Sequence, residues 1–276
     1  MTKLFQQIRE GASPEPQVLF DVLVEHLPLL FEMEGTEQDL EWHAEGNVWI
    51  HTSMVLERAY GEWDGHGDRL VHVLASFLHD IGKTLTTKRS MRDGLERVVS
   101  PRHAKVGRSY LLPRLHRTGL DQPTIDAVVS LVGYHHYPRP SMAGRFPKIN
   151  KLYQQQRVCD TRSLFRLERA DIQGRLGPDE EEQLLMLDLF KLECEEQGLW
   201  DNPAPYSEWV EEFTHTFSDQ GPEFVEAALY KAIYDYERGR FGHLKEGIAR
   251  SYQMRDGFPT LIMLCGPPGS GKSTWR

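Results

Sequence analysis

The sequence predicts an all-α fold for most of its 276 residues. Apolar residues recur at helical spacing in one segment after another, and these segments end at glycine or proline. Only one apolar run has the character of a strand, Phe258–Cys265 near the C-terminal end. We therefore expect a helical bundle that is followed by the start of a different kind of domain.

Three helices are expected in the first part of the chain. Residues 15–31 carry Val18, Leu19, Val22 and Leu23 at helical spacing, and residues 48–60 form a second such segment. A third helix is expected over residues 68–81, with Gly82 as its C-terminal cap.

A polar, basic stretch follows up to about Pro101. Beyond it, Asp121 is a typical start signal for a helix and Pro138 a typical stop. The remaining helices are expected over residues 102–115, 121–136, 160–173, 179–196, 206–217 and 222–238.

The composition is that of an ordinary cytoplasmic protein. Hydrophobic residues make up 39% of the chain, and its three cysteines are far apart, which argues against a disulfide framework. The N-terminus has no signal-peptide pattern, and no apolar run reaches the roughly 18 residues of a membrane span. We expect no membrane partner.

Charge is distributed unevenly along the sequence. Residues 83–117 contain ten basic and two acidic residues, although the net charge of the chain is −9. Residues 178–224 contain fourteen acidic residues and one basic residue. This separation favours a face that binds anions, but ordinary solvated helix faces would give the same pattern.

Histidine and aspartate residues at separated positions are candidate metal ligands, because divalent cations bind imidazole and carboxylate groups that converge on one point. His79 and Asp80 are adjacent at a predicted helix end, where both side chains can face one site. Any one histidine alone is better explained as a surface or capping residue. The candidates are His51, His79, Asp80, His103, His136 and Asp171.

The order of these residues resembles the HD superfamily of metal-dependent phosphohydrolases, in particular the HD module of bacterial tRNA nucleotidyltransferases. The similar strings, within residues 46–176, are GNVWIHT, FLHDIGK, PRHAKVG, LVGYHH and RADIQGR. The resemblance implies that a first metal binds His51, His79, Asp80 and Asp171. Asp80 would bridge to a second metal, which His103 and His136 would bind.

The neighbouring His135 is the alternative to His136. Helical register places His136 with Ile125, Val129 and Val132 on an inward face, so His136 is the preferred ligand.

Two cations follow the candidate ligands by about one helical turn. Lys83 comes after Asp80, and Arg175 comes after Asp171. Both are suited to binding phosphate oxygens beside a metal-activated water. For Lys83 the alternative role is to satisfy carbonyl groups at a helix end.

The string GPPGSGKS after the strand-like run fits a P-loop, which binds the phosphates of ATP together with Mg²⁺. Its predicted nucleotide-binding residues are Gly266, Gly269, Gly271, Lys272, Ser273 and Thr274. We place a domain boundary near Asp256, with residues 1–255 as the phosphohydrolase domain and 256–276 as the start of a kinase domain. A kinase needs a sheet, an acid and a lid besides this string, so we expect the P-loop to be inactive here.

The two motifs together resemble the bacterial bifunctional HD-domain phosphohydrolase–polynucleotide kinases. That resemblance implies removal of 2′,3′-cyclic, 2′ or 3′ phosphates from RNA or DNA ends and a functional link to a nucleic-acid ligase. The metal would be manganese, nickel, cobalt, iron, zinc or magnesium. Two alternatives remain, a mononucleotide phosphohydrolase and a non-catalytic HD module that senses a ligand for a P-loop NTPase.

Overall fold

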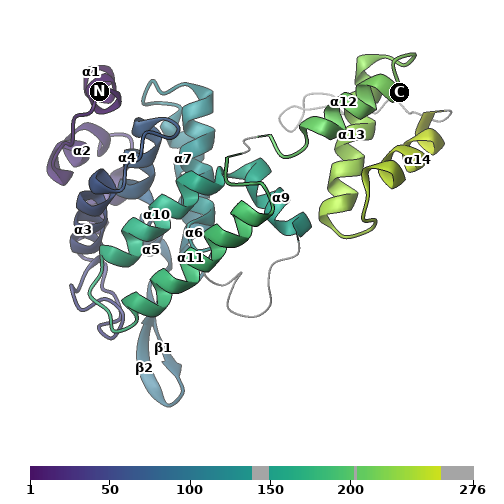
Figure 1. Cartoon of the computed structure of the whole chain (residues 1–276). Coiled ribbons are helices and arrows are strands. Elements are labelled where there is room, and N and C mark those ends of the chain that lie inside the picture. The colour runs from purple at the N-terminus through teal and green to yellow at the C-terminus, as the bar shows by residue number, and fades with distance from the viewer. Residues whose placement is uncertain (139–148, 202–203, 256–276) are drawn as a thin grey trace, which may run out of the picture. The chain divides into compact units, whose positions relative to one another are not determined.

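The computed structural model describes residues 1–138, 149–201 and 204–255, and these residues are mostly helical, as predicted (Figure 1). The chain divides into two compact units, residues 1–205 and 206–276. The helices of the first unit are α1 Thr2–Arg9, α2 Pro16–Leu23, α3 Val48–Gly61, α4 Arg69–Leu78, α5 Lys83–Thr86, α6 His103–Leu115, α7 Gln122–Tyr134, α9 Ile149–Val158, α10 Thr161–Gln173 and α11 Glu180–Glu196.

Helix α4 lies at the centre of the first unit. All ten of its residues are buried, and it contacts α1, α3, α7 and α10. Asp68 caps its N-terminus by accepting a hydrogen bond from the backbone N–H of Leu70. Because a helix buried on every side is held by all its neighbours, the residues at its C-terminal end have fixed positions.

The helix predicted over residues 15–31 is interrupted. Helix α2 ends at Leu23, and a short 3-10 helix follows at Pro28–Glu32. Proline lacks an N–H group and disfavours helical geometry in the residue before it, and Leu27 is accordingly non-helical, with φ −124° and ψ 66°. The apolar spacing was read correctly, but Pro28 divides the helix.

A hairpin occupies the basic stretch for which no element was predicted. Strands β1 (Lys88–Arg92) and β2 (Leu95–Val99) are antiparallel and project from the helices (Figure 1). They are joined by Asp93 and Gly94, both with positive φ, as a tight two-residue turn requires. The strands are largely exposed, so their sequence lacks the alternating pattern by which half-buried strands are predicted.

Gly82 is not the C-terminal cap of the helix predicted over residues 68–81, which corrects the sequence-based interpretation: His79 follows the last residue of α4, and Gly82 lies at the N-terminus of α5. Its φ of −70° and ψ of −16° are right-handed, whereas a C-capping glycine is left-handed. A Cβ atom at this position would lie 2.1 Å from the His103 carbonyl oxygen and 2.6 Å from the backbone nitrogen of Gly107. Glycine is needed here because α6 passes against the backbone.

The second unit contains the helices α12 Ser207–Thr216, α13 Pro222–Glu237 and α14 Leu244–Arg255. Aromatic side chains pack between them, with the rings of Trp209 and Phe241 stacked at 6.2 Å between centroids. The described helices thus divide before Tyr206. The boundary predicted near Asp256 lies outside the described residues and stays a prediction. Within the described part of the chain, no helix combines the length and apolar character needed to cross a membrane.

Candidate metal centre

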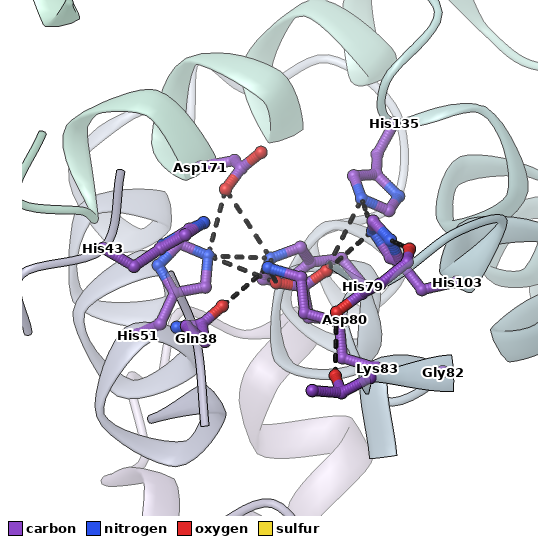
Figure 2. Close-up of polar contacts among 12 residues, drawn as sticks. Gln38, His43, His51, His79, Asp80, Gly82, Lys83, His103, His135 and Asp171 are labelled. Carbon is purple, nitrogen blue, oxygen red and sulfur yellow. Dashed lines mark hydrogen bonds and ion pairs between the residues drawn. The ribbon is translucent and has the colours of Figure 1, made fainter. Parts of the chain in front are cut away.

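The carboxylate of Asp80 lies between two groups of histidines (Figure 2). Its Oδ2 atom is 3.3 Å from Nε2 of His79 and 3.4 Å from Nε2 of His51. Its Oδ1 atom is 3.1 Å from Nε2 of His103 and 3.7 Å from Nε2 of His135. The two oxygens of one side chain therefore serve separate sets of donor atoms.

The first donor group consists of His51, His79, Asp80 and Asp171, the four residues predicted to bind one metal. Asp171 belongs to α10, and its Oδ1 lies 3.1 Å from Nε2 of His51 and 3.7 Å from Nε2 of His79. His51 comes from α3, while His79 and Asp80 follow the end of α4. Residues from three helices far apart in sequence thus meet at one point.

The second donor group consists of Asp80, His103, His135 and His136. Nε2 of His103, at the start of α6, lies 3.3 Å from Nε2 of His135 and 3.0 Å from Nε2 of His136. Both histidines that follow α7 therefore reach the same point as His103.

The structure corrects the register argument that placed His136 inward. His135 is fully buried, whereas His136 is partly exposed. His135 keeps right-handed helical geometry beyond the last residue of α7, so its side chain follows the buried residues Leu131 and Val132 by one turn. The choice between the two histidines as ligand stays open.

Three of the histidines share one orientation. Each Nδ1 lies 2.7–2.8 Å from the carbonyl oxygen of the residue three positions earlier, to which it donates a hydrogen bond. The pairs are His79 with Ser76, His103 with Ser100, and His135 with Val132. This arrangement leaves each Nε2 lone pair directed into the cluster, as metal ligation requires.

Glu45 contacts His51, the remaining histidine of the first donor group. Its Oε1 atom lies 3.1 Å from Nδ1 of His51 and 2.8 Å from Nδ1 of His43, while its Oε2 accepts the backbone N–H of Leu176 at 2.9 Å. The Glu45 side chain is almost completely buried. Sequence reasoning did not identify His43 or Glu45, although both lie within three residues of the string that begins at Gly46.

The electrostatic environment differs between the two groups. Burial opposes protonation of His51, but hydrogen bonds to Asp171 and Glu45 outweigh it and raise its pKa to about 9. Burial, with the nearby charges of His79 and His103, lowers the pKa of His135 to about 3. Burial also disfavours the charged form of Asp80, yet Lys83 and His79 hold its pKa well below the usual value. Asp80 is thus an anion surrounded by nitrogen donors.

Lys83 lies at the first donor group. Its Nζ atom is 2.7 Å from Oδ2 of Asp80 and donates a hydrogen bond to Oε1 of Gln38 at 2.6 Å. The lysine is predominantly buried, so its charge is directed at the centre and not at solvent. Gln38 was not among the predicted residues, because it lies in an irregular segment before α3.

Arg175 follows the C-terminal end of α10. Its Nη2 atom is 2.7 Å from Oδ1 of Asp179, four residues further along the chain. The guanidinium group is therefore engaged by a carboxylate, and its predicted contact with phosphate stays a prediction.

The donor set fits one or two divalent cations. Oδ1 of Asp80 is buried and has no hydrogen-bond partner in the part of the chain that the structure describes, a costly state for a carboxylate oxygen. Imidazole nitrogens and carboxylate oxygens are ligands for borderline and hard metals. Above the cluster, a hollow of about 200 Å³ is lined by Gln38, Trp42, Lys83, His103 and His136, among others. Residues of the centre therefore line an open hollow.

The predicted P-loop lies outside the described residues. Its residues Gly266, Gly269, Gly271, Lys272, Ser273 and Thr274 therefore remain candidates from the sequence alone.

Part of the chain is similar to known proteins. The chain is 40% identical over 83 residues to the Multifunctional CCA protein of Shewanella frigidimarina and 40% identical over 79 residues to that of Psychromonas ingrahamii. These alignments cover 28% and 26% of the chain but only 19% and 18% of the two relatives. No solved structure matches the chain significantly.

A family model, that of the HD domain, matches residues 48–186. The matched residues make up half of the chain and include His51, Asp80 and Asp171. The chain therefore belongs to the HD-domain family, a superfamily of metal-dependent hydrolases.

Proposed function

We propose that this protein is a metal-dependent phosphohydrolase that removes 2′,3′-cyclic, 2′ or 3′ phosphates from the ends of RNA or DNA. The observation that carries the proposal is the position of Asp80, whose oxygens face two donor groups while Lys83 contacts Oδ2. One carboxylate between two sets of nitrogen donors is suited to two cations that share a phosphate ester.

The residues that would hold the cations are those of the two donor groups. His51, His79 and Asp171, with Oδ2 of Asp80 beside them, form one site, and Asp80, His103 and either or both of His135 and His136 form the other. When bound, manganese, nickel, cobalt, iron, zinc or magnesium would polarise the phosphoryl oxygens and lower the pKa of a bound water towards neutrality.

The other residues of the centre act on the substrate phosphate. Lys83 supplies a buried positive charge where negative charge develops on phosphoryl oxygens, and Gln38 holds its ammonium group in place. The fixed Nδ1 contacts of the histidines keep the centre organised before substrate binds, so little reorganisation is required during the reaction.

A polynucleotide end is the proposed substrate for two reasons. The sequence has a P-loop string at residues 266–273, C-terminal to the HD residues, and this combination is found in the bifunctional family that it resembles. Helix α6, which begins at the ligand His103, also carries the exposed Lys105 and the partly exposed Arg108, which are suited to a phosphate backbone. A ligase that joins the resulting 3′-hydroxyl end is the proposed functional partner.

The test compares the unmodified chain with Asp80→Asn across a panel of the six metals. Substrates are an oligonucleotide with a 3′ phosphate, one with a 2′,3′-cyclic phosphate and a 3′-mononucleotide, and released phosphate or the shift in end group is measured. Asp188→Asn is the matched control, because Asp188 is an exposed carboxylate whose nearest ion pair is 3.7 Å from Arg169.

We expect metal-dependent reaction of both oligonucleotides by the unmodified chain and by Asp188→Asn, and its loss in Asp80→Asn. Hydrolysis of the mononucleotide alone would identify a mononucleotide phosphohydrolase. Metal binding without hydrolysis of any phosphate ester would support a sensor module instead.

A further inference from the structure

A groove of about 770 Å³ lies between α6 and α7, beside the hollow over the metal centre. Ser100, His103 and His136 line both the groove and the hollow. The two spaces therefore adjoin at the second donor group, and the groove leads from the ligands His103 and His136 along the two helices that carry them.

Three cations of the basic segment line the groove. In the hairpin, Arg89 is paired with Glu37 and Arg97 with Asp39, so these residues are neutralised by the loop before α3. The three groove cations are Arg102, Lys105 and Arg108. Unlike the hairpin arginines, none of them has a carboxylate partner in the described part of the chain. The groove therefore has three cationic side chains that no carboxylate of the described residues neutralises.

These cations lie at the N-terminal end of α6. Arg102 immediately precedes the helix, and Lys105 and Arg108, three residues apart, lie on one face of its first turns. Arg102 has a left-handed backbone, with φ 60° and ψ 19°, which is uncommon for a residue other than glycine and is a conformation concentrated at functional sites.

Aromatic rings form part of the opposite wall. Tyr134 and Tyr137 line the groove with ring centroids 6.0 Å apart, and the Tyr137 hydroxyl donates a hydrogen bond to the carbonyl of Lys151 at 3.3 Å. Cations beside aromatic rings are the combination that binds single-stranded nucleic acid, with the cations at the phosphates and the rings at the bases.

We propose that this groove binds the last nucleotides of a single-stranded polynucleotide whose terminal phosphate lies at the metal centre. The proposal rests on the proposed function and adds the path of the strand, from the hollow over Asp80 across His103 and His136 into the groove. It follows that substrates with nucleotides before the terminal phosphate bind more tightly than a mononucleotide.

The test measures binding separately from hydrolysis. The chain without added metal is titrated against a fluorescent single strand of about ten nucleotides that ends in a 3′-hydroxyl group, and the anisotropy is recorded at several salt concentrations. The variant Lys105→Gln/Arg108→Gln removes two groove cations. The matched control Lys88→Gln/Arg117→Gln removes two cations that do not line the groove.

We expect the groove variant to weaken binding about tenfold and to reduce the slope of log affinity against log salt by about 1.4, because two phosphate contacts are lost. The control should change the affinity less than about threefold, since only non-specific attraction is lost. Equal effects of the two variants would overturn the proposal.

A second variant displaces one cation without removing its charge. A Cβ atom at Gly133 would lie 2.8 Å from Cδ of Arg108, so Gly133→Ala moves the arginine side chain away from its place over α7. Alanine is the better helix former, which keeps the helix intact. We expect a loss of affinity of about threefold, with hydrolysis of a 3′-mononucleotide unchanged. Unchanged strand affinity in Gly133→Ala would contradict a role for Arg108.

The outcomes separate the two proposals. Tight binding through the groove without hydrolysis of any 3′ phosphate would refute the proposed function and leave the groove as a nucleic-acid site. Hydrolysis of 3′-phosphorylated strands with the same KM in the groove variant and the unmodified chain would refute the groove and leave the proposed function.

Discussion

The Nζ atom of Lys83 lies 2.7 Å from Oδ2 of Asp80, the same oxygen that faces His51 and His79. A buried ammonium group thus shares a carboxylate oxygen with the nitrogen donors of a candidate metal site. Because lysine has no lone pair at neutral pH, it cannot be a ligand there. Its charge is available to a phosphate that approaches the cluster.

Lys83→Met is predicted to separate metal binding from catalysis. Methionine has a similar length and no charge, so the donor atoms stay in place while a phosphoryl oxygen loses its cationic partner. We expect kcat to fall about 100-fold or more with little change in bound metal. Metal content by elemental analysis and phosphate release provide the two readouts.

Lys88→Met is the control for this change, because Lys88 is an exposed residue of the hairpin. It should keep both metal and activity. If Lys83→Met lost its metal along with its activity, the lysine would be needed to organise the donor atoms and the assigned role would be wrong.

Glu45→Gln is predicted to weaken metal binding through His51. One carboxylate contacts His43, His51 and the N–H group of Leu176, and all three are donors when the histidines are neutral and protonated at Nδ1. In glutamine one carboxylate oxygen is replaced by an N–H₂ group, which is itself a donor and so cannot accept a hydrogen bond from one of these three N–H groups. When a ligating histidine loses the hydrogen-bond acceptor of its second ring nitrogen, the metal affinity falls by about 10- to 100-fold.

Calorimetric titration with Mn²⁺ measures this effect. The control is Glu41→Gln, which lies in the same loop but pairs with Arg97 near the surface. Equal Mn²⁺ affinities in the two variants would show that Glu45 does not position His51.

Three of the residues that sequence reasoning identified share a physical reason for being identifiable. His79, Asp80 and Asp171 lie on or beside α4 and α10, whose apolar residues recur at helical spacing. A polar residue that interrupts such a pattern is conspicuous. The all-α fold was predictable from the same spacing. His51 and His103 were identified from the order of the motifs along the chain.

The site residues that were not predicted from the sequence lie in a segment without the periodicity of a helix or a strand. Gln38, His43 and Glu45 belong to an irregular segment whose path is set by contacts with residues distant in sequence, such as Leu176. The burial of His135 also depended on whether helical geometry continued past Tyr134. Helix ends are the least certain part of any helix, and one residue there changes which side chain faces inward.

Gly82→Ala is predicted to disturb the second donor group. The new Cβ would meet the His103 carbonyl at 2.1 Å and the Gly107 backbone at 2.6 Å, and backbone atoms cannot move aside as side-chain ends can. Helix α6 must shift, which costs about 3 kcal/mol of unfolding free energy and carries His103 away from Asp80. Chemical denaturation and the Mn²⁺ stoichiometry both report the change.

Gly61→Ala is the matched control, because Gly61 ends α3 with open space around its missing Cβ. It should alter the unfolding free energy by less than about 0.5 kcal/mol. A Gly82→Ala protein as stable as this control would mean that α6 does not need the close approach.

His72 is predicted to make the fold sensitive to acid. The ring is buried in α4, its Nε2 lies 2.8 Å from the carbonyl oxygen of Ala59, and burial lowers its pKa to about 4 from an ordinary value near 6.5. The folded state therefore binds its proton less readily than the unfolded state. Stability from this group is complete above pH 6.5 and is lost as the pH falls towards 4.

Between pH 7 and pH 5 the loss from His72 amounts to about 2 kcal/mol of unfolding free energy. His72→Gln keeps a donor for the Ala59 carbonyl and has no titratable group, so it should lose about 2 kcal/mol less than the unmodified chain over the same interval. Urea denaturation of both proteins at the two pH values measures the difference. The contributions of the other buried histidines are the same in both proteins and cancel in the comparison. An equal loss of unfolding free energy in the two proteins would show that His72 does not remain neutral in the fold.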